Sequence, residues 1–92
     1  MSRDEALRLG DMAAHLLSDE VVQEVFRRLE EGYADAWRST DITDTMTREQ
    51  LYHASKALND LRRHLKVIAD SGTFERAQLS KAGLFTQSES KL

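Results

Sequence analysis

The stretch LYHASKALNDLRRHLKVI, residues 51–68, decides the fold. Its apolar residues recur at intervals of three and four, the period of an α-helix that packs along one face. They are Leu51, Ala54, Leu58, Leu61, Leu65 and Ile68. Thr47 and Gln50 form a capping box before this stretch, and Gly72 after it is suited to a left-handed helix end. The sequence therefore predicts a helix over about residues 48–71.

A second helix of the same period precedes this one. Its apolar positions, also three and four residues apart, are Val22, Phe26, Leu29, Tyr33 and Ala36. With Ser18 as its cap, this helix should cover about residues 19–39. The short polar side chains of residues 39–45 mark the connection. Two such helices joined by a short loop predict an antiparallel helical hairpin.

Shorter helices are expected on either side of the hairpin. Ser2 and Glu5 can form a capping box for a helix over about residues 3–17, which Gly10 weakens by about 1 kcal/mol relative to Ala. Thr73 can open a last helix over about residues 74–82. Residues 86–92 are small and polar, and we expect them to form a flexible tail. The expected fold is all-α, with residues 1–85 as a single helical domain.

Composition limits the possible classes of protein. The chain has 92 residues, of which 40% are hydrophobic and 32% charged, as in soluble globular proteins. A domain of this size has a small core and usually needs disulfides, metals or self-association. Because the chain has no cysteine, we expect self-association to supply the additional stability. The sequence shows neither a secretion signal nor an apolar run long enough to span a membrane. We therefore expect no membrane partner.

Net charge is distributed unevenly along the chain. The total is −3 at pH 7, but residues 1–46 carry five basic and eleven acidic residues, whereas residues 47–92 carry eight basic and five acidic ones. This balance is unlike that of proteins that coat nucleic acids, which are strongly basic. It predicts that the two halves attract each other, within the fold or between copies.

No catalytic, cofactor-binding or metal-binding set is expected. The sequence has no glycine-rich phosphate loop and no cysteine nucleophile, and its histidines lack the spacing at which two imidazoles on one helix reach one metal. Glu30, Glu31 and Asp35 are interpreted as an exposed acidic face, because no carboxylate of the third helix is placed to complete a site with them. The sequence thus predicts a protein that is not an enzyme.

Two clusters are candidates for contact with a partner. Tyr33, Trp37, Tyr52 and His53 should gather at the loop end of the hairpin, where they either form an interface or close the core. A basic stretch on the third helix could contact nucleic acid or an acidic partner, or could be neutralised by the acidic second helix or by another copy. Its residues are Lys56, Arg62, Arg63 and Lys66.

One segment resembles a group of viral proteins. It starts with Ala36-Trp37-Arg38-Ser39-Thr40, continues after an acidic loop with Leu51-Tyr52-His53-Ala54 and residues 57–62, and closes with Asp70-Ser71-Gly72. In this order the segment resembles small uncharacterised helical proteins of tailed bacteriophages and prophages, over about residues 17–79. The resemblance implies a phage origin and a non-enzymatic role in the virion, in packaging or in takeover of the host.

These observations lead to three hypotheses. The first is a small helical protein that self-associates and acts by protein contact, as a phage assembly, virion or packaging-associated component in the host cytoplasm or the virion. The second is an acidic inhibitor of a host enzyme or defence protein, which would use the acidic N-terminal half against a basic cleft. The third is nucleic-acid binding by an oligomer through the basic stretch.

Overall fold

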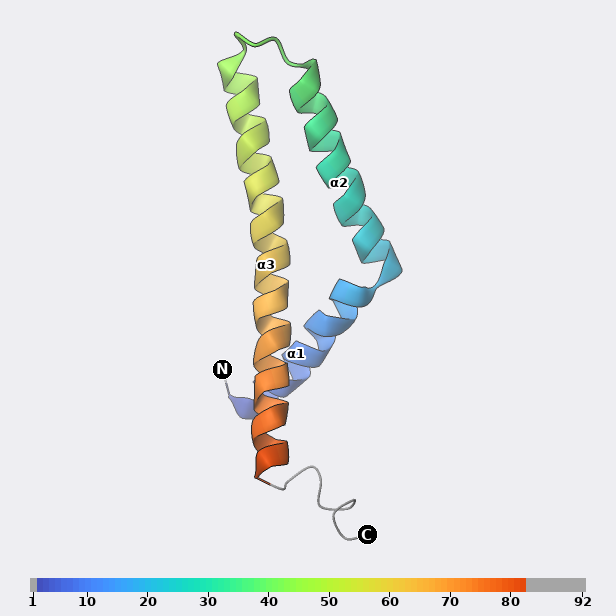
Figure 1. Ribbon diagram of the computed structural model, residues 1–92, viewed down its shortest axis with the longest axis vertical. Helices are drawn as coiled ribbons and strands as arrows, with labels where there is room; N and C mark the ends of the chain where they lie inside the picture. The colour runs from blue at the N-terminus through green and yellow to red at the C-terminus, as the bar shows by residue number, and fades with distance from the viewer. Residues whose placement is uncertain (1, 83–92) are drawn as a thin grey trace. The chain divides into compact units, whose positions relative to one another are not determined.

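Over the residues that the structure describes, the protein is all-helical, as predicted. The computed structural model describes residues 2–82 and contains three helices, α1 (Arg3–Ser18), α2 (Glu20–Ser39) and α3 (Thr45–Lys81), with no strand in that range (Figure 1). No helix in residues 2–82 is both long and apolar enough to span a membrane. The tail expected over residues 86–92 lies outside the described residues.

Local hydrogen bonds start α1 and α2. The Ser2 amide donates to Glu5 Oε1 and the Glu5 amide donates to Ser2 Oγ, both at 3.2 Å, which confirms the predicted capping box. For α2 the predicted cap is wrong by one residue. Asp19, not Ser18, has the extended backbone of a cap, and its carboxylate accepts hydrogen bonds from the amides of Val21 and Val22.

The third helix begins earlier than predicted. Asp44 accepts a hydrogen bond from the Thr47 amide at its carboxylate, at 3.1 Å, and one from the Arg48 amide at its carbonyl. The expected cap at Thr47 is therefore wrong, because an aspartate three residues upstream already satisfies the free amides of the first turn. The loop between α2 and α3 shortens to residues 40–44.

The third helix also continues beyond its predicted end. Instead of a helix over residues 48–71 and a short one over 74–82, α3 runs unbroken for 37 residues. Gly72 does not cap it, and Thr73 does not start a new helix but donates its hydroxyl to the Ala69 carbonyl within the same helix. The expected hairpin with two short terminal helices is thus wrong for the C-terminal part of the chain.

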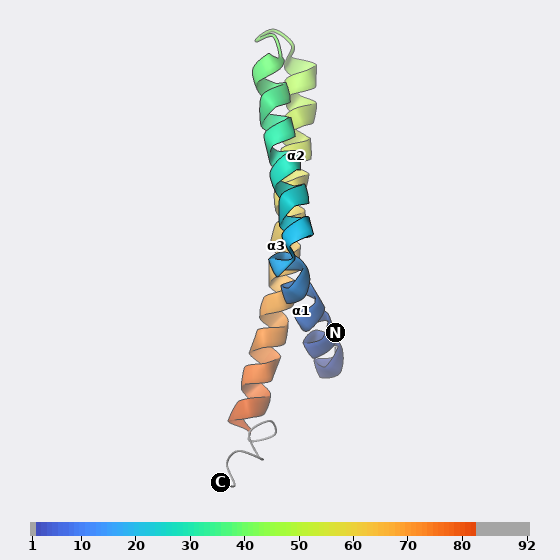
Figure 2. The same ribbon diagram turned by 90° about the vertical axis from the view of Figure 1, so that its right-hand side faces the viewer.

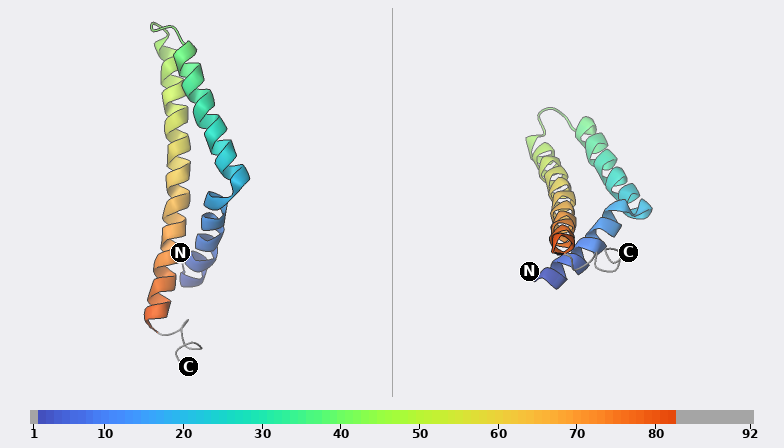
Figure 3. Two further views of the ribbon diagram at one scale, coloured as in Figure 1. Left: turned by 45° about the vertical axis from the view of Figure 1, so that its right-hand side comes forward. Right: turned by 60° about the horizontal axis from the view of Figure 1, so that its bottom comes forward.

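The chain forms two compact units. Unit 1 combines Met1–Leu16 with Leu65–Leu92, and unit 2 is Leu17–His64. In unit 1, α1 crosses the second part of α3 through the buried small residues Ala6, Gly10 and Ala13 (Figure 3). A Cβ atom built on Gly10 would lie 2.6 Å from Gly72 Cα, so the two backbones touch at these glycines. The single domain expected over residues 1–85 stays a prediction.

In unit 2, α2 and residues 45–64 of α3 run antiparallel, side by side in Figures 1 and 2. We call these two segments the α2–α3 pair. Phe26 of α2 and Leu58 of α3 are its buried apolar side chains. The buried apolar set of the described chain is small, and no side chain in it is fully buried. It consists of Ala6, Ala13, Phe26, Leu58 and Leu79.

Candidate functional site

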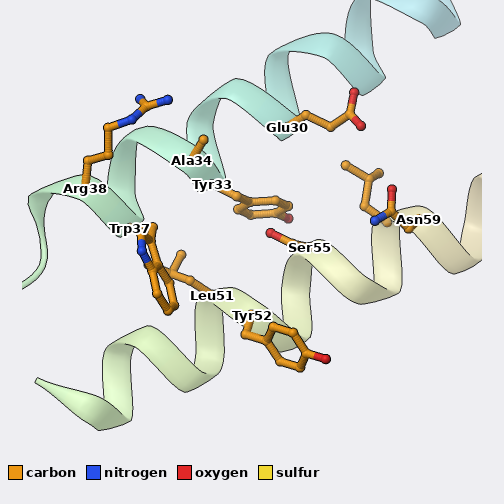
Figure 4. Close-up of a pocket in the computed structure, with 10 residues that line it drawn as sticks. Glu30, Tyr33, Ala34, Trp37, Arg38, Leu51, Tyr52, Ser55 and Asn59 are labelled. Atoms are coloured by element: carbon orange, nitrogen blue, oxygen red, sulfur yellow. The ribbon is translucent and has the colours of Figure 1, made fainter.

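A cleft lies between the two helices of the α2–α3 pair near their loop end. Tyr33 and Trp37 of α2 point toward α3, where Leu51 and Ser55 face them (Figure 4). These positions meet because both helices repeat the four-and-three spacing that keeps one face toward a partner. The cleft has a volume of about 490 Å³. Its lining residues are Glu30, Tyr33, Ala34, Trp37, Arg38, Leu51, Tyr52, Ser55, Leu58 and Asn59.

The aromatic side chains of the cleft remain partly open to solvent. Trp37 is 40% exposed and Tyr52 is 57% exposed. Arg48 stacks its guanidinium over the Trp37 ring at 4.4 Å from the ring centroid and donates from Nε to Thr40 Oγ1 at 2.8 Å. The indole is therefore held in place without being buried, a state typical of interface anchors.

Three of the four predicted interface residues share this cleft. Tyr33, Trp37 and Tyr52 line it, whereas His53 is not among its lining residues. His53 instead contacts Tyr52, with the two ring centroids 5.6 Å apart and the rings edge to face. His53 lies two residues after Leu51, so it points about 200° around the helix from Leu51 and away from the cleft.

A charged pair links the two helices at the other end of the cleft. Arg62 donates two hydrogen bonds to the Glu30 carboxylate, each at 3.1 Å, and its guanidinium lies 4.8 Å from the centroid of the Phe26 ring. The hydrogen bonds from Arg62 lower the pKa of Glu30 below its usual range, and those to Glu30 raise the pKa of Arg62. This pair shows the register of α2 against α3.

The basic stretch is largely paired with acids of the chain itself. Besides the Glu30–Arg62 pair, Arg63 lies 3.2 Å from Asp60. Lys66, which belongs to unit 1, lies 3.4 Å from Asp70. Lys56 is exposed. Glu30 of the acidic second helix supplies the charge opposite Arg62, one of the alternatives considered from the sequence.

Sequence reasoning missed several residues of the cleft. Glu30 is exposed, as expected, but the sequence did not identify its bond to Arg62 across the helix pair. Spacing alone did not identify these positions: it placed Leu29, Ala36 and Leu61 on the packed side, which is wrong because all three are exposed. The structure instead sets residues 26, 30, 33 and 37 of α2 against residues 51, 55, 58 and 62 of α3. Polar residues at such positions are easily overlooked, because the search for a seam follows apolar side chains.

The walls of the cleft are suited to contact with an apolar group. Its aromatic and aliphatic walls carry a few polar groups, and its one carboxylate is bonded to Arg62. No group of three potential metal-ligating side chains occurs within residues 2–82. No family model, no curated protein and no solved structure matches the chain.

Proposed function

We propose that this chain is a non-enzymatic helical protein that self-associates and acts by protein–protein contact. One observation supports this most strongly: no side chain in the described part of the chain is fully buried, while many large apolar side chains are exposed. The exposed ones are Met12, Leu16, Val21, Val25, Leu29, Trp37, Ile42, Met46, Tyr52, Leu61, Val67 and Phe74.

Energetics make such a surface costly for a lone chain. Burying one large apolar side chain contributes about 1.5–3 kcal/mol, and exposed side chains forgo this stabilisation. Proteins of this size also have little core to compensate. Association with a second copy or another protein would bury part of the apolar surface and add stability through mass action.

The cleft is the site we propose for contact with a different protein. Trp37 and Tyr52 are partly exposed at its walls, and Arg38 and Asn59 also line it. An apolar side chain of a partner can enter between the rings, and the polar groups can orient its backbone. A role in bacteriophage assembly, in the virion or in packaging, acting in the host cytoplasm or the virion, is proposed from the sequence resemblance over residues 17–79.

Self-association is tested by size-exclusion chromatography with light scattering at low and at moderate salt. We expect a defined oligomer that survives moderate salt, because apolar contacts are not screened by ions. Its melting temperature should rise with protein concentration. A chain that stays monomeric at high micromolar concentration, with a melting temperature that does not depend on concentration, would contradict the proposal.

A further inference from the structure

The α2–α3 pair has a regular arrangement of residues around its contact. We define the seam as the positions through which the helices face each other, spaced by four, three and four on each helix. They are Phe26, Glu30, Tyr33, Trp37, Leu51, Ser55, Leu58 and Arg62. The bonds between Glu30 and Arg62, and the cleft lined by residues of both helices, establish this register.

Positions that follow the seam by one residue lie on the cleft side. Ala34 and Arg38 follow Tyr33 and Trp37 on α2, and Tyr52 and Asn59 follow Leu51 and Leu58 on α3. All four line the cleft. This side is highly charged, since five of its eight positions carry a charge. The charged ones are Arg27, Glu31, Arg38, Lys56 and Arg63.

Positions that precede the seam by one residue lie on the opposite side of the pair, because successive residues turn in one direction around a helix. None of these eight positions is charged. We call them the uncharged face, and they are Val25, Leu29, Gly32, Ala36, Gln50, Ala54, Ala57 and Leu61. Seven are exposed and Ala54 is half-buried. Because 32% of the residues of the chain are charged, two or three of eight positions would be expected to carry a charge, whereas none of these does.

The small side chains of this face are suited to helix packing. Gly32, Ala36, Ala54 and Ala57 have small side chains or none, which lets another helix approach closely. The face covers residues 25–36 of α2 and 50–61 of α3, about 17 Å along each helix at 1.5 Å per residue, and it is two helices wide.

We propose that the uncharged face binds the same face of a second copy and so forms a four-helix bundle from two α2–α3 pairs. This inference rests on the proposed self-association and names its surface. A two-fold interface sets one surface against itself, so residues near the axis meet their own copies and a charge there would repel its equivalent. The uncharged face has no such charge, whereas the cleft side carries five. Two-fold pairing leaves the cleft free for another protein.

The test compares two glutamate substitutions at similarly exposed aliphatic residues of α3. Leu61, on the uncharged face, is 54% exposed, and Val67, outside it, is 51% exposed. We expect light scattering to find a dimer for the wild type and for Val67→Glu, and a monomer with unchanged helicity for Leu61→Glu. If the wild type is an oligomer and Leu61→Glu dissociates no more than Val67→Glu, the face is wrong although self-association stands. A monomeric wild type would overturn both.

A second measurement guards against a Leu61→Glu variant that simply misfolds. Because the chain has no cysteine, single-cysteine variants report one position each. Ala57→Cys probes the uncharged face and Lys56→Cys the cleft side, one residue away. We expect alkylation of Ala57→Cys to slow several-fold as protein concentration rises, with no change for Lys56→Cys. Equal rates for the two thiols at all concentrations would overturn the proposal.

Discussion

Helices meet in two different ways in the two units of this protein. In unit 1 the backbones of α1 and α3 touch at Gly10 and Gly72, with Ala6 and Ala13 buried beside them. In unit 2, α2 and α3 are separated by side chains, with Phe26 and Leu58 buried and a cleft next to them. Small residues bring helices close and leave no room between them, whereas large ones create grooves that a partner can use.

Polar contacts differ less between the two units. Arg3 lies 2.9 Å from Glu75 and Arg76 lies 2.9 Å from Asp11 in unit 1, while Glu30 and Arg62 pair in unit 2. All of these ion pairs are partly exposed, and such pairs contribute at most about 1 kcal/mol each. Stability should therefore depend mainly on the contact between Gly10 and Gly72 in unit 1 and on the packing of Phe26 and Leu58 in unit 2.

Truncating Phe26 should have the largest effect. Its ring is 7% exposed and lies under the Arg62 guanidinium. We expect Phe26→Ala to lower the free energy of unfolding by about 3–5 kcal/mol, because it removes a buried ring and leaves a void. Denaturant unfolding gives the size of the loss, and hydrogen exchange shows whether the amides of α2 open before those of α1. A loss below about 1 kcal/mol would contradict the assigned role of the seam.

A methyl group at the glycine crossing should have the next largest effect. In Gly10→Ala the new Cβ would lie 2.6 Å from Gly72 Cα, and backbone cannot move aside as a side chain can. We expect a net loss of about 1–3 kcal/mol in spite of the better helix propensity of alanine. Denaturant unfolding at low micromolar concentration measures it.

The matched control for the glycine crossing is Gly32→Ala. Gly32 also lies inside a helix, but a Cβ built there meets nothing within 4 Å. Both glycine variants are compared in the Leu61→Glu background, where Gly32 is expected to face solvent, and there Gly32→Ala should raise the free energy of unfolding by about 0.5–1 kcal/mol because alanine favours the helix. If Gly10→Ala and Gly32→Ala both stabilised the protein, the close crossing of α1 and α3 would be wrong.

The smallest expected effect is the pH dependence of the Glu30–Arg62 pair. Because Arg62 lowers the pKa of Glu30 below its ordinary value of 4.5, the pair stabilises the fold above that pH and this stabilisation is lost as the pH falls through the folded-state pKa. The melting temperature of Glu30→Gln should therefore fall less on acidification than that of the wild type. Glu31→Gln leaves the pair intact and should retain the wild-type fall. Identical pH profiles for all three proteins would contradict the contribution of the pair.

Local signals predicted the positions of α1 and α2 well. The capping box of Ser2 and Glu5 is confirmed, and α2 occupies almost the range that its apolar period indicates. These features depend on residues within one or two turns of each other, so the sequence displays them directly. The errors at Ser18 and Thr47 arose where neighbouring aspartates compete for the same free amides.

The cleft could be predicted only in part. Aromatic residues at the loop end indicated Tyr33, Trp37 and Tyr52, which do line it. Neutralisation of the basic stretch by the acidic second helix was one of the alternatives, but the sequence did not identify Glu30 as the partner of Arg62. Their contact depends on the register between two helices, which the periods constrain but which only the packing of side chains such as Phe26 decides.

By itself the sequence determined that the chain is helical and where its first two helices lie. Only the tertiary structure decided the role of Gly72. From neighbouring residues alone, a glycine followed by a threonine predicts the end of one helix and the start of another. The structure instead shows that α3 continues through both residues to Lys81. The physical reason is a contact between residues far apart in the sequence. Because Gly72 has no side chain, the backbone of Gly10 can lie against it, and this contact does not require α3 to end.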